Sequence, residues 1–422
     1  MAEESILSDD FVRELMNVGD VDIVVGVPTH NDGRTVGQVV QAVRAGLLKY
    51  FPRERAVIIN ADGGSHDGTQ DLVRAAAISD LSATADIHAL RTLHSISTQY
   101  EQGPASGLAL RTILAATDLL QARACAVISP ESTALEPDWV EKLVRPVFRD
   151  RRDLVLPVYR RHKFDGLLIR NLVYPMAKTL YGCAVREPYP ADFAFSGEMG
   201  SRFLAQDIWE QEQGRRGTEL WMTLWAAIGR SKLSQTFLGS KTRREDAPSD
   251  LVGAMRETAG TLFNSLDAYA EVWRSAAEPV PAPCSGCESA ISREPSRLNR
   301  KRLHDMFVFG VQELDPVFLS ILSPPTHDAL KTLATLKEEN FNYSPTLWAR
   351  TVYEFATAYH KGVIGRDHIV QALVPLFRGR AYTFLTENRD ASAEEVEHNI
   401  ELVCQAFENE KPRLVELWDG AK

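Results

Sequence analysis

The most distinctive local pattern in the sequence is the stretch ADGGSHDGT at positions 61–69. It follows the apolar run AVIIN at 56–60, which predicts a buried strand, and it precedes a run with helical spacing of apolar residues. Asp62 would therefore leave the end of a strand, where its carboxylate can accept hydrogen bonds from a nucleobase or a ribose. Gly63 and Gly64 would let a ligand approach the backbone closely. The pattern favours a nucleotide-binding turn, although a capped strand–helix turn without a ligand uses the same residue types.

A second turn of this kind lies at GVPTHND, residues 26–32. Pro28 fixes the backbone where the strand predicted at 22–28 ends. His30 could act as a base or a ligand, but a lone histidine in a loop is more often a polar surface group. Because the carboxyl ends of parallel strands meet at one edge of a sheet, we expect Pro28 and Asp62 to lie at the same edge.

A third polar cluster, Ser129-Pro130-Glu131-Ser132, ends the apolar run at Ala124–Ile128. In a parallel α/β domain this is again a position where ligands bind. A divalent metal ion at such a position prefers carboxylate oxygens. The cluster offers one carboxylate, that of Glu131.

Strand, loop and helix alternate four times in the first 150 residues, which predicts a mostly parallel sheet flanked by helices. Strands are expected at 22–28, 56–60, 86–90, 125–129, 153–159 and 234–238. Helices are expected after the sheet region at 198–213, 218–229 and 250–274, and then at 297–322, 326–337, 344–361, 365–377 and 392–418. The predicted domains are an α/β domain over 1–270, a Pro-rich linker over 271–296 and a helical domain over 297–422.

Composition narrows the function. The chain has 422 residues, a net charge of -10 and five cysteines. The negative charge argues against a nucleic-acid partner. The acidic N-terminus is not a signal peptide, and no stretch is apolar enough to span a membrane, so we expect a cytoplasmic protein. Sparse cysteines indicate a reduced compartment, and the lone pair Cys284 and Cys287 lacks the further ligands of a zinc site.

The order of the motifs resembles that of family 2-type glycosyltransferases with the GT-A fold, in the subgroup of mannosylglycerate and glucosylglycerate synthases. The two loops at 26–32 and 61–69 carry the first part of the resemblance. Further motifs follow in the same order: YRRHKFDG (159–166), NLVYPMAKTLYG (171–182), REPYPADFAFSGE (186–198), GTELWMT (217–223), FLGSK (237–241), LWARTVYEFATAYH (347–360), PLFRGRA (375–381) and KPRLVELW (411–418).

This resemblance implies that a hexose moves from a nucleotide sugar to a small, anionic, glycerate-like acceptor, with retention of anomeric configuration. The implied nucleotide-sugar-binding residues are Pro28, Asn31, Asp62, Gly63, Gly103, Glu131, Lys241 and Arg243. The implied acceptor-binding residues are Arg161, Asp165, Tyr174 and Arg186, near His162 and Lys163. Asp192 and Glu219 are the implied catalytic carboxylates; Glu219 stands where the family has an aspartate, so its carboxylate would be displaced by about 1 Å. The chain could also form a homo-oligomer.

The sequence departs from the family at the metal site. The family's Asp-x-Asp falls on Ser129 and Glu131, and its later histidine falls on or near Arg243. Three interpretations remain open. Glu131 could hold Mg²⁺ or Mn²⁺ together with phosphate oxygens. Lys241, Arg243 or Arg244 could neutralise the diphosphate without a metal. The chain could instead be an inactive binding or interaction protein with a degenerate metal site. A nucleotidyltransferase is disfavoured, since GVPTHNDGRT is a poor match to the basic glycine-rich loop of that class.

Overall fold

The structure, a computed structural model, describes residues 6–78, 93–99, 106–211, 216–241, 250–275, 278–286 and 299–420. The chain divides into two compact units that interleave along the sequence. The first unit holds Met1–Tyr159, Pro190–Ala247 and Pro281–Glu288, and the second holds Arg160–Tyr189, Pro248–Val280 and Ser289–Lys422. The sequence predicts consecutive domains instead. The units interleave because apolar side chains before residue 280 pack on the C-terminal helices, as the ring of Trp273 does against Trp418 at 5.1 Å.

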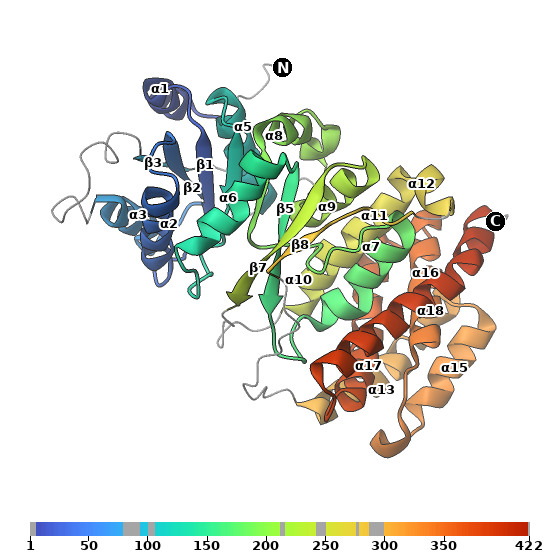
Figure 1. The fold of residues 1–422 in the computed structure, drawn as a ribbon. Helices are drawn as coiled ribbons and strands as arrows, with labels where there is room; N and C mark the ends of the chain where they lie inside the picture. The colour runs from blue at the N-terminus through green and yellow to red at the C-terminus, as the bar shows by residue number, and fades with distance from the viewer. Residues whose placement is uncertain are drawn as a thin grey trace. The chain divides into compact units, whose positions relative to one another are not determined.

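The first unit is built on an eight-stranded sheet in the order β3-β2-β1-β4-β6-β5-β7-β8. The strands are β1 Ile23–Thr29, β2 Ala56–Asp62, β3 Leu93–Gln99, β4 Ala124–Val127, β5 Leu154–Arg160, β6 Phe193–Ser196, β7 Leu233–Ser240 and β8 Cys284–Ser285. Strand β1 pairs in parallel with β2 and β4, and β2 pairs in parallel with β3. Strand β6 is antiparallel to β4 and β5. The expected fold class, a mostly parallel sheet flanked by helices, is confirmed (Figure 1).

Three strands, β3, β6 and β8, lie where none is expected. Strand β6 was missed because it has only four residues, yet three of them are fully buried or nearly so. Strand β8 falls inside the predicted linker 271–296 and pairs with β7. The strand expected at 86–90 lies outside the described residues, and the third strand of the sheet is β3.

Helices cover both faces of the sheet. They are α1 Asp9–Val18, α2 Val36–Tyr50, α3 Thr69–Ile78, α5 Ser106–Leu119, α6 Asp138–Asp150, α8 Gly197–Leu204 and α9 Thr218–Ile228. Helices α2, α3 and α6 share one apolar core with Ile23, Val25 and Val27 of β1. The alternate residue Gly26 faces α5, where an added Cβ would lie 2.6 Å from Ile113. The α5 layer, which includes α8 and α9, therefore covers the opposite face.

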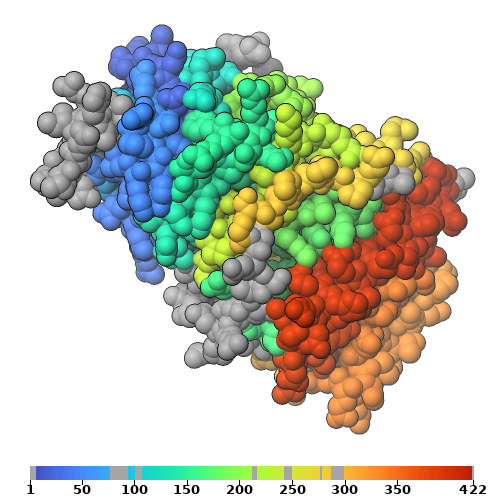
Figure 2. Space-filling model, in the orientation of Figure 1, coloured from blue at the N-terminus to red at the C-terminus, as the bar shows by residue number. Residues whose placement is uncertain are grey.

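The second unit is helical. Its helices are α7 Tyr174–Tyr181, α10 Leu251–Met255, α11 Thr261–Ala268, α12 Ala270–Arg274, α13 Arg300–Glu313, α14 Asp315–Ile321, α15 Pro324–Ala334, α16 Pro345–Lys361, α17 Arg366–Glu387 and α18 Ala393–Asp419, and π-helical turns lie at Ile169–Val173 and Arg256–Gly260. Figure 2 shows α18, in red, beside an orange segment of the same unit, and α18 packs on α16. Among the described residues, no helix is both long and apolar enough to cross a membrane.

Four of the expected helices are wrong in extent. The helix expected over 365–377 continues to Glu387 as α17. The helix expected over 198–213 ends at Leu204 and is followed by a 3₁₀ turn at Asp207–Glu210. The helix expected over 250–274 is broken, since Tyr269 leaves helical geometry between α11 and α12 with φ −124°. The helix expected over 297–322 is divided into α13 and α14, because Pro316 in the first turn of α14 cannot donate to the preceding helix.

Helices α13 and α17 cross at close range in the core of the second unit. A Cβ on Gly379 would lie 2.4 Å from the Phe307 ring, and one on Gly310 would lie 2.3 Å from Pro375. Beside this crossing, the fully buried Arg380 donates from Nε to Asn171 Oδ1 (3.0 Å) and from Nη1 to the Tyr343 carbonyl (2.9 Å). A buried guanidinium is tolerated only when its donors are satisfied in this way.

Candidate functional site

The loops after β1 and β2 are joined by a series of hydrogen bonds at one edge of the sheet. The Gly63 amide donates to the Thr29 carbonyl (2.8 Å), and the Asn31 amide donates to Ser65 Oγ (2.8 Å). The His66 amide donates in return to Asn31 Oδ1 (3.0 Å). Asn31 adopts a left-handed conformation (φ 57°), which asparagine tolerates better than most residues. The predicted proximity of these loops is confirmed, and the two loops form one rigid turn pair.

Asp62 is the centre of this turn pair. Its carboxylate is fully buried and accepts from Thr29 Oγ1 (2.8 Å), from the Ser65 amide (2.8 Å) and hydroxyl (2.6 Å), and from Gln70 Nε2 (2.9 Å). It also accepts from the amide of Gly64, which has φ 82°. Burial acts to raise the pKa of the Asp62 carboxyl, but the hydrogen bonds led by Ser65 outweigh it and lower that pKa below its ordinary value. In this structure, Asp62 shapes the turn through protein contacts.

The loop 129–132 after β4 depends on a different carboxylate. Asp192 stands directly before β6, and the antiparallel pairing of Val127 with Phe193 brings it to the end of β4. Its fully buried carboxylate accepts from the Ser129 amide (2.8 Å), from Ser132 Oγ (2.9 and 3.0 Å) and from the Tyr159 hydroxyl (2.5 Å). Asp192 was predicted as a catalytic carboxylate, and the structure surrounds it with protein donors.

A lysine lies next to this network. Lys241, the residue after β7, has its Nζ 4.7 Å from the centroid of the Tyr159 ring. Such an arrangement is a cation–π contact. Since the Tyr159 hydroxyl donates to Asp192 and Asp192 binds the Ser129 amide, the chain places an ammonium group beside the support of the 129–132 loop.

The loop 129–132 offers one carboxylate and two hydroxyl groups. Glu131 is exposed, and Ser129 and Ser132 add hydroxyls. Among the described residues, the one group of three His, Cys, Asp or Glu side chains arranged for an ion lies elsewhere and does not include Glu131. The Asp192 carboxylate has both oxygens engaged. A metal at Glu131 would therefore take most of its ligands from water and from phosphate oxygens.

The other residues predicted to bind the nucleotide sugar or to act in catalysis lie in different environments. Pro28 is in β1 opposite Ala61, next to the Thr29–Asp62 pair. Glu219 is partly buried in the first turn of α9. Gly103, Arg243 and Arg244 lie outside the described residues.

The residues predicted to bind the acceptor belong to the second unit or its border, and most have protein partners. Arg161 makes a bidentate pair with Glu187, from Nε to Oε1 (2.6 Å) and from Nη2 to Oε2 (2.8 Å). Arg186 pairs with Glu397. Lys163 Nζ donates to the Arg389 and Ala391 carbonyls, and Asp165 Oδ2 accepts from the His162 amide (3.3 Å).

Tyr174 is part of an apolar cluster of the second unit. It packs with Phe384, Val396 and Ile400, and its hydroxyl donates to Glu401 (3.3 Å). Burial raises the pKa of its phenol well above the ordinary value. Its position indicates a packing role.

Several residues of these networks were not predicted. Tyr159 links Lys241 to Asp192, Ser65 joins the first two loops, and Arg170 lies partly buried near Arg161, donating to the Lys163 carbonyl (2.7 Å). For Tyr159, a signal existed: it ends the strand predicted at 153–159, at the same sheet edge as the other candidates. Serine hydroxyls in loops carry no comparable signal.

Three of the described cysteines are buried, which makes their thiols poor nucleophiles. Cys125, Cys183 and Cys404 are free and buried, and burial raises the pKa of each thiol to about 12. Cys284 is disulfide-bonded, which the expectation of reduced thiols did not anticipate.

Comparison with known proteins gives distant matches to solved structures. No protein-family model matches the chain, and no curated protein matches its sequence. Glucosyl-3-phosphoglycerate synthase from Mycobacterium tuberculosis with Mn²⁺, UDP and glucosyl-3-phosphoglycerate matches at 19% identity and a TM-score of 0.42, over 63% of this chain and 86% of that chain. The same enzyme with Mn²⁺, UDP and phosphoglyceric acid matches at 20% identity and a TM-score of 0.43, over 61% and 81%. Similarity at this level does not establish a family or an activity.

Proposed function

We propose that the chain is a glycosyltransferase that moves a hexose from a nucleotide sugar to a small anionic acceptor such as a glycerate, with retention at the anomeric carbon. The ordered sequence motifs from residue 26 to residue 418 and the sheet edge described above support this proposal. The turn pair after β1 and β2 would receive the nucleotide, because its backbone is already fixed and Gly63 and Gly64 leave room for close approach.

The observation that carries the proposal is the position of Lys241 beside the Tyr159–Asp192 support of the 129–132 loop. When the bond between the sugar and the diphosphate breaks, negative charge develops on the leaving phosphate. A fixed ammonium at this position would stabilise that charge. In this proposal the cation of Lys241, assisted by Arg243 or Arg244, stabilises the leaving diphosphate. In the family that the motifs resemble, a metal ion held by two aspartates does this.

The other residues predicted for the site are proposed to have distinct roles. Asp62 and Asp192 act as positioning residues, since their buried carboxylates are taken up by protein donors. Glu219 is proposed to contact the sugar or the acceptor. Arg161 and Arg186 are proposed to attract the anionic acceptor through their guanidinium groups, and Asp165 is proposed to accept a hydrogen bond from a hydroxyl of the acceptor.

The test is transfer from a panel of nucleotide sugars to anionic acceptors, read as release of nucleoside diphosphate. UDP-glucose and phosphoglyceric acid, the ligands of a compared structure, are the first pair to try. Activity that persists in EDTA and falls in Lys241→Ala and Arg243→Ala supports cation-assisted departure. Activity that requires Mg²⁺ or Mn²⁺ and is lost in Glu131→Gln contradicts that part of the proposal and supports a metal at Glu131.

A second candidate is a binding protein that keeps the fold without turnover. The observation in its favour is that Asp62, Asp192 and Tyr174, three residues predicted to contact ligands, are buried and bonded to the protein. Calorimetric binding of nucleotide without diphosphate release across the whole panel would favour this candidate over the transferase.

A further inference from the structure

A buried histidine in the second unit has no hydrogen-bond partner among the described residues. His304, on α13, is 7% exposed, and neither Nδ1 nor Nε2 makes a hydrogen bond. Its ring packs against Phe341 at 4.9 Å and Tyr382 at 5.5 Å. Neutral imidazole carries one donor and one acceptor, and leaving both unmade in a protein interior is unfavourable.

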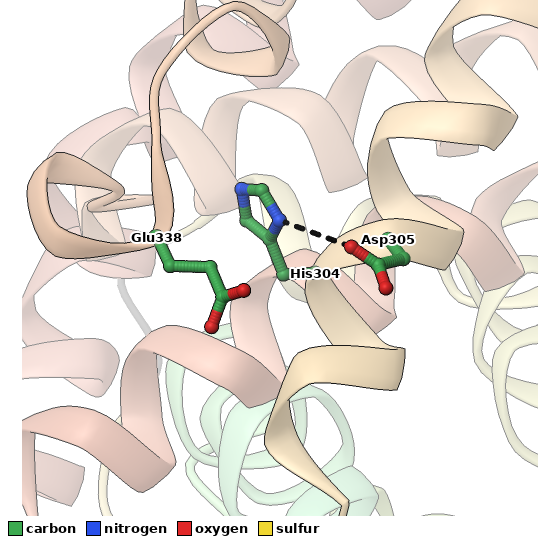
Figure 3. Close-up of side chains that lie close together, drawn as sticks. All are labelled: His304, Asp305 and Glu338. Atoms are coloured by element: carbon green, nitrogen blue, oxygen red, sulfur yellow. Dashed lines mark ion pairs between the residues drawn. The ribbon is translucent and has the colours of Figure 1, made fainter.

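Two carboxylates lie beside this ring (Figure 3). Asp305 Oδ1 is 3.8 Å from His304 Nδ1, and Glu338 approaches from the 3₁₀ turn Glu338–Asn340. One ligand atom from each of the three side chains lies within 4.8 Å of the others. The three groups thus converge from a helix and a separate turn.

The turn that carries Glu338 is tied to α17. The Tyr382 hydroxyl donates to the Glu338 carbonyl (3.0 Å), and the Tyr343 amide donates to Thr383 Oγ1 (2.9 Å). Helix α17 in turn packs on α13, which carries His304. The backbone positions of the three side chains are therefore fixed by the packing of this unit alone.

A second buried histidine shows the contrast. His327, on α15, is also almost buried, and its Nε2 is 2.8 Å from Asp315 Oδ1. Like His304, it is followed in sequence by an exposed aspartate, and Asp328 Oδ1 is 3.8 Å from its Nδ1. The two sites share the same local ion-pair geometry, but His304 lacks the direct hydrogen bond and has Glu338 instead.

We propose that His304, Asp305 and Glu338 bind a divalent transition-metal ion, with Zn²⁺ as the favoured ion. One imidazole nitrogen and two carboxylate oxygens suit Zn²⁺, and the two negative charges balance the ion. Ligands about 2.0–2.2 Å from a tetrahedral ion are roughly 3.4 Å apart, so a side-chain movement of about 1 Å closes the site. Asp305 is exposed and Glu338 is partly exposed, which permits that movement and leaves a coordination position for water.

The test uses the full-length chain, stripped of metal and free of nucleotide, in the Glu131→Gln background. Titration with Co²⁺ should give visible absorption from one bound ion per chain, which Zn²⁺ then displaces. Asp305→Asn and Glu338→Gln should each weaken Zn²⁺ binding by at least about tenfold, a loss typical of an altered metal site. His304→Gln should abolish the absorption, with circular dichroism as the check that the variant is folded.

The matched control is Asp328→Asn, which removes the equivalent exposed carboxylate beside His327 and should leave binding unchanged. The proposal is overturned if no ion binds at micromolar concentration. It is also overturned if Glu338→Gln and Asp305→Asn bind as the parent does, or if Asp328→Asn weakens binding as much as Asp305→Asn does. Asp305→Asn and Glu338→Gln change exposed or partly exposed side chains, so they test the proposal even if His304→Gln does not fold.

Discussion

Two loops at the same edge of the sheet are held by buried carboxylates that come from different parts of the sequence. The turn pair after β1 and β2 contains its own carboxylate, Asp62, which receives donors from its own loop and from Thr29. The 129–132 loop after β4 instead donates to the carboxylate of Asp192, which lies about 60 residues further along the sequence. The first region is organised locally, and the second is organised only when β6 joins the sheet.

In the second loop, the residues that hold the backbone are different from the residues that carry an exposed or nearby charge. Asp192 and Tyr159 fix the backbone of residues 129–132 without using Glu131. Glu131 in the loop and Lys241 beside Tyr159 are therefore separate from the hydrogen bonds through which Asp192 holds the Ser129 amide and the Ser132 hydroxyl.

The largest expected effect concerns the charge. In the proposed transferase, Lys241→Ala should lower the rate of transfer by roughly 10²–10³-fold, the loss typical of removing one stabilising group at a developing anion. The measurement is kcat with saturating donor and acceptor. Lys232→Ala, an exposed lysine just before the other end of β7, is the control and should retain full activity. Equal activity of both variants would remove Lys241 from the mechanism.

The next largest effect is expected from removing the Asp192 carboxylate that holds the 129–132 loop. Asp192→Ala leaves the Ser129 amide and the Ser132 and Tyr159 hydroxyls without their acceptor, and we expect a loss of about 3 kcal/mol in the free energy of unfolding. Urea denaturation of the variant measures this loss. A change below about 0.5 kcal/mol, the size of an ordinary surface substitution, would show that the loop does not depend on Asp192.

Tyr159→Phe divides the two contacts of Tyr159. It removes the hydrogen bond to Asp192 but keeps the ring that contacts Lys241, so we expect a loss of about 1 kcal/mol in stability. Urea denaturation again gives the value. If the ring is what positions Lys241, Tyr159→Leu should reduce transfer more than Tyr159→Phe does.

The local support is tested by pH. The pKa of Asp62 is lowered in the folded protein, so its contribution to stability is complete above its ordinary value of 3.8 and is lost as pH falls through the lower, folded pKa. The difference in unfolding free energy between the parent and Asp62→Asn should therefore be constant near neutral pH and shrink below about pH 4. A difference that does not change with pH would mean that the ionised carboxylate is not what holds the turn.

The smallest expected effect is that of Glu131→Gln on stability. Its side chain is exposed, and substitutions at exposed positions usually change stability by less than about 0.5 kcal/mol, so thermal unfolding should be nearly unchanged. A clear loss of stability would mean that Glu131 belongs to the support, as Asp192 does, and would remove the distinction between support and charge.

Much of the first unit follows from local sequence. The strands at 22–28, 56–60, 153–159 and 234–238 were placed within about two residues by apolar runs followed by turn residues. The pairing of the first two loops followed from the rule that parallel strands end at one edge. Strand β6 could not be predicted because four residues give too short a pattern, and the pairing of β6 with β4 is what brings Asp192 to the 129–132 loop.

The sequence by itself determined the mostly parallel sheet, the helical character of the second half and the single carboxylate of residues 129–132, because these depend on periodicity and residue type. Only the tertiary structure decided which polar groups form hydrogen bonds with other groups of the protein. Burial requires these carboxylates and phenols to bond to the protein: Asp62 bonds mainly within its own loop, whereas Asp192 and Tyr174 bond to residues distant in sequence. The same rule, applied to His304, identifies a buried group whose partner the described chain does not supply.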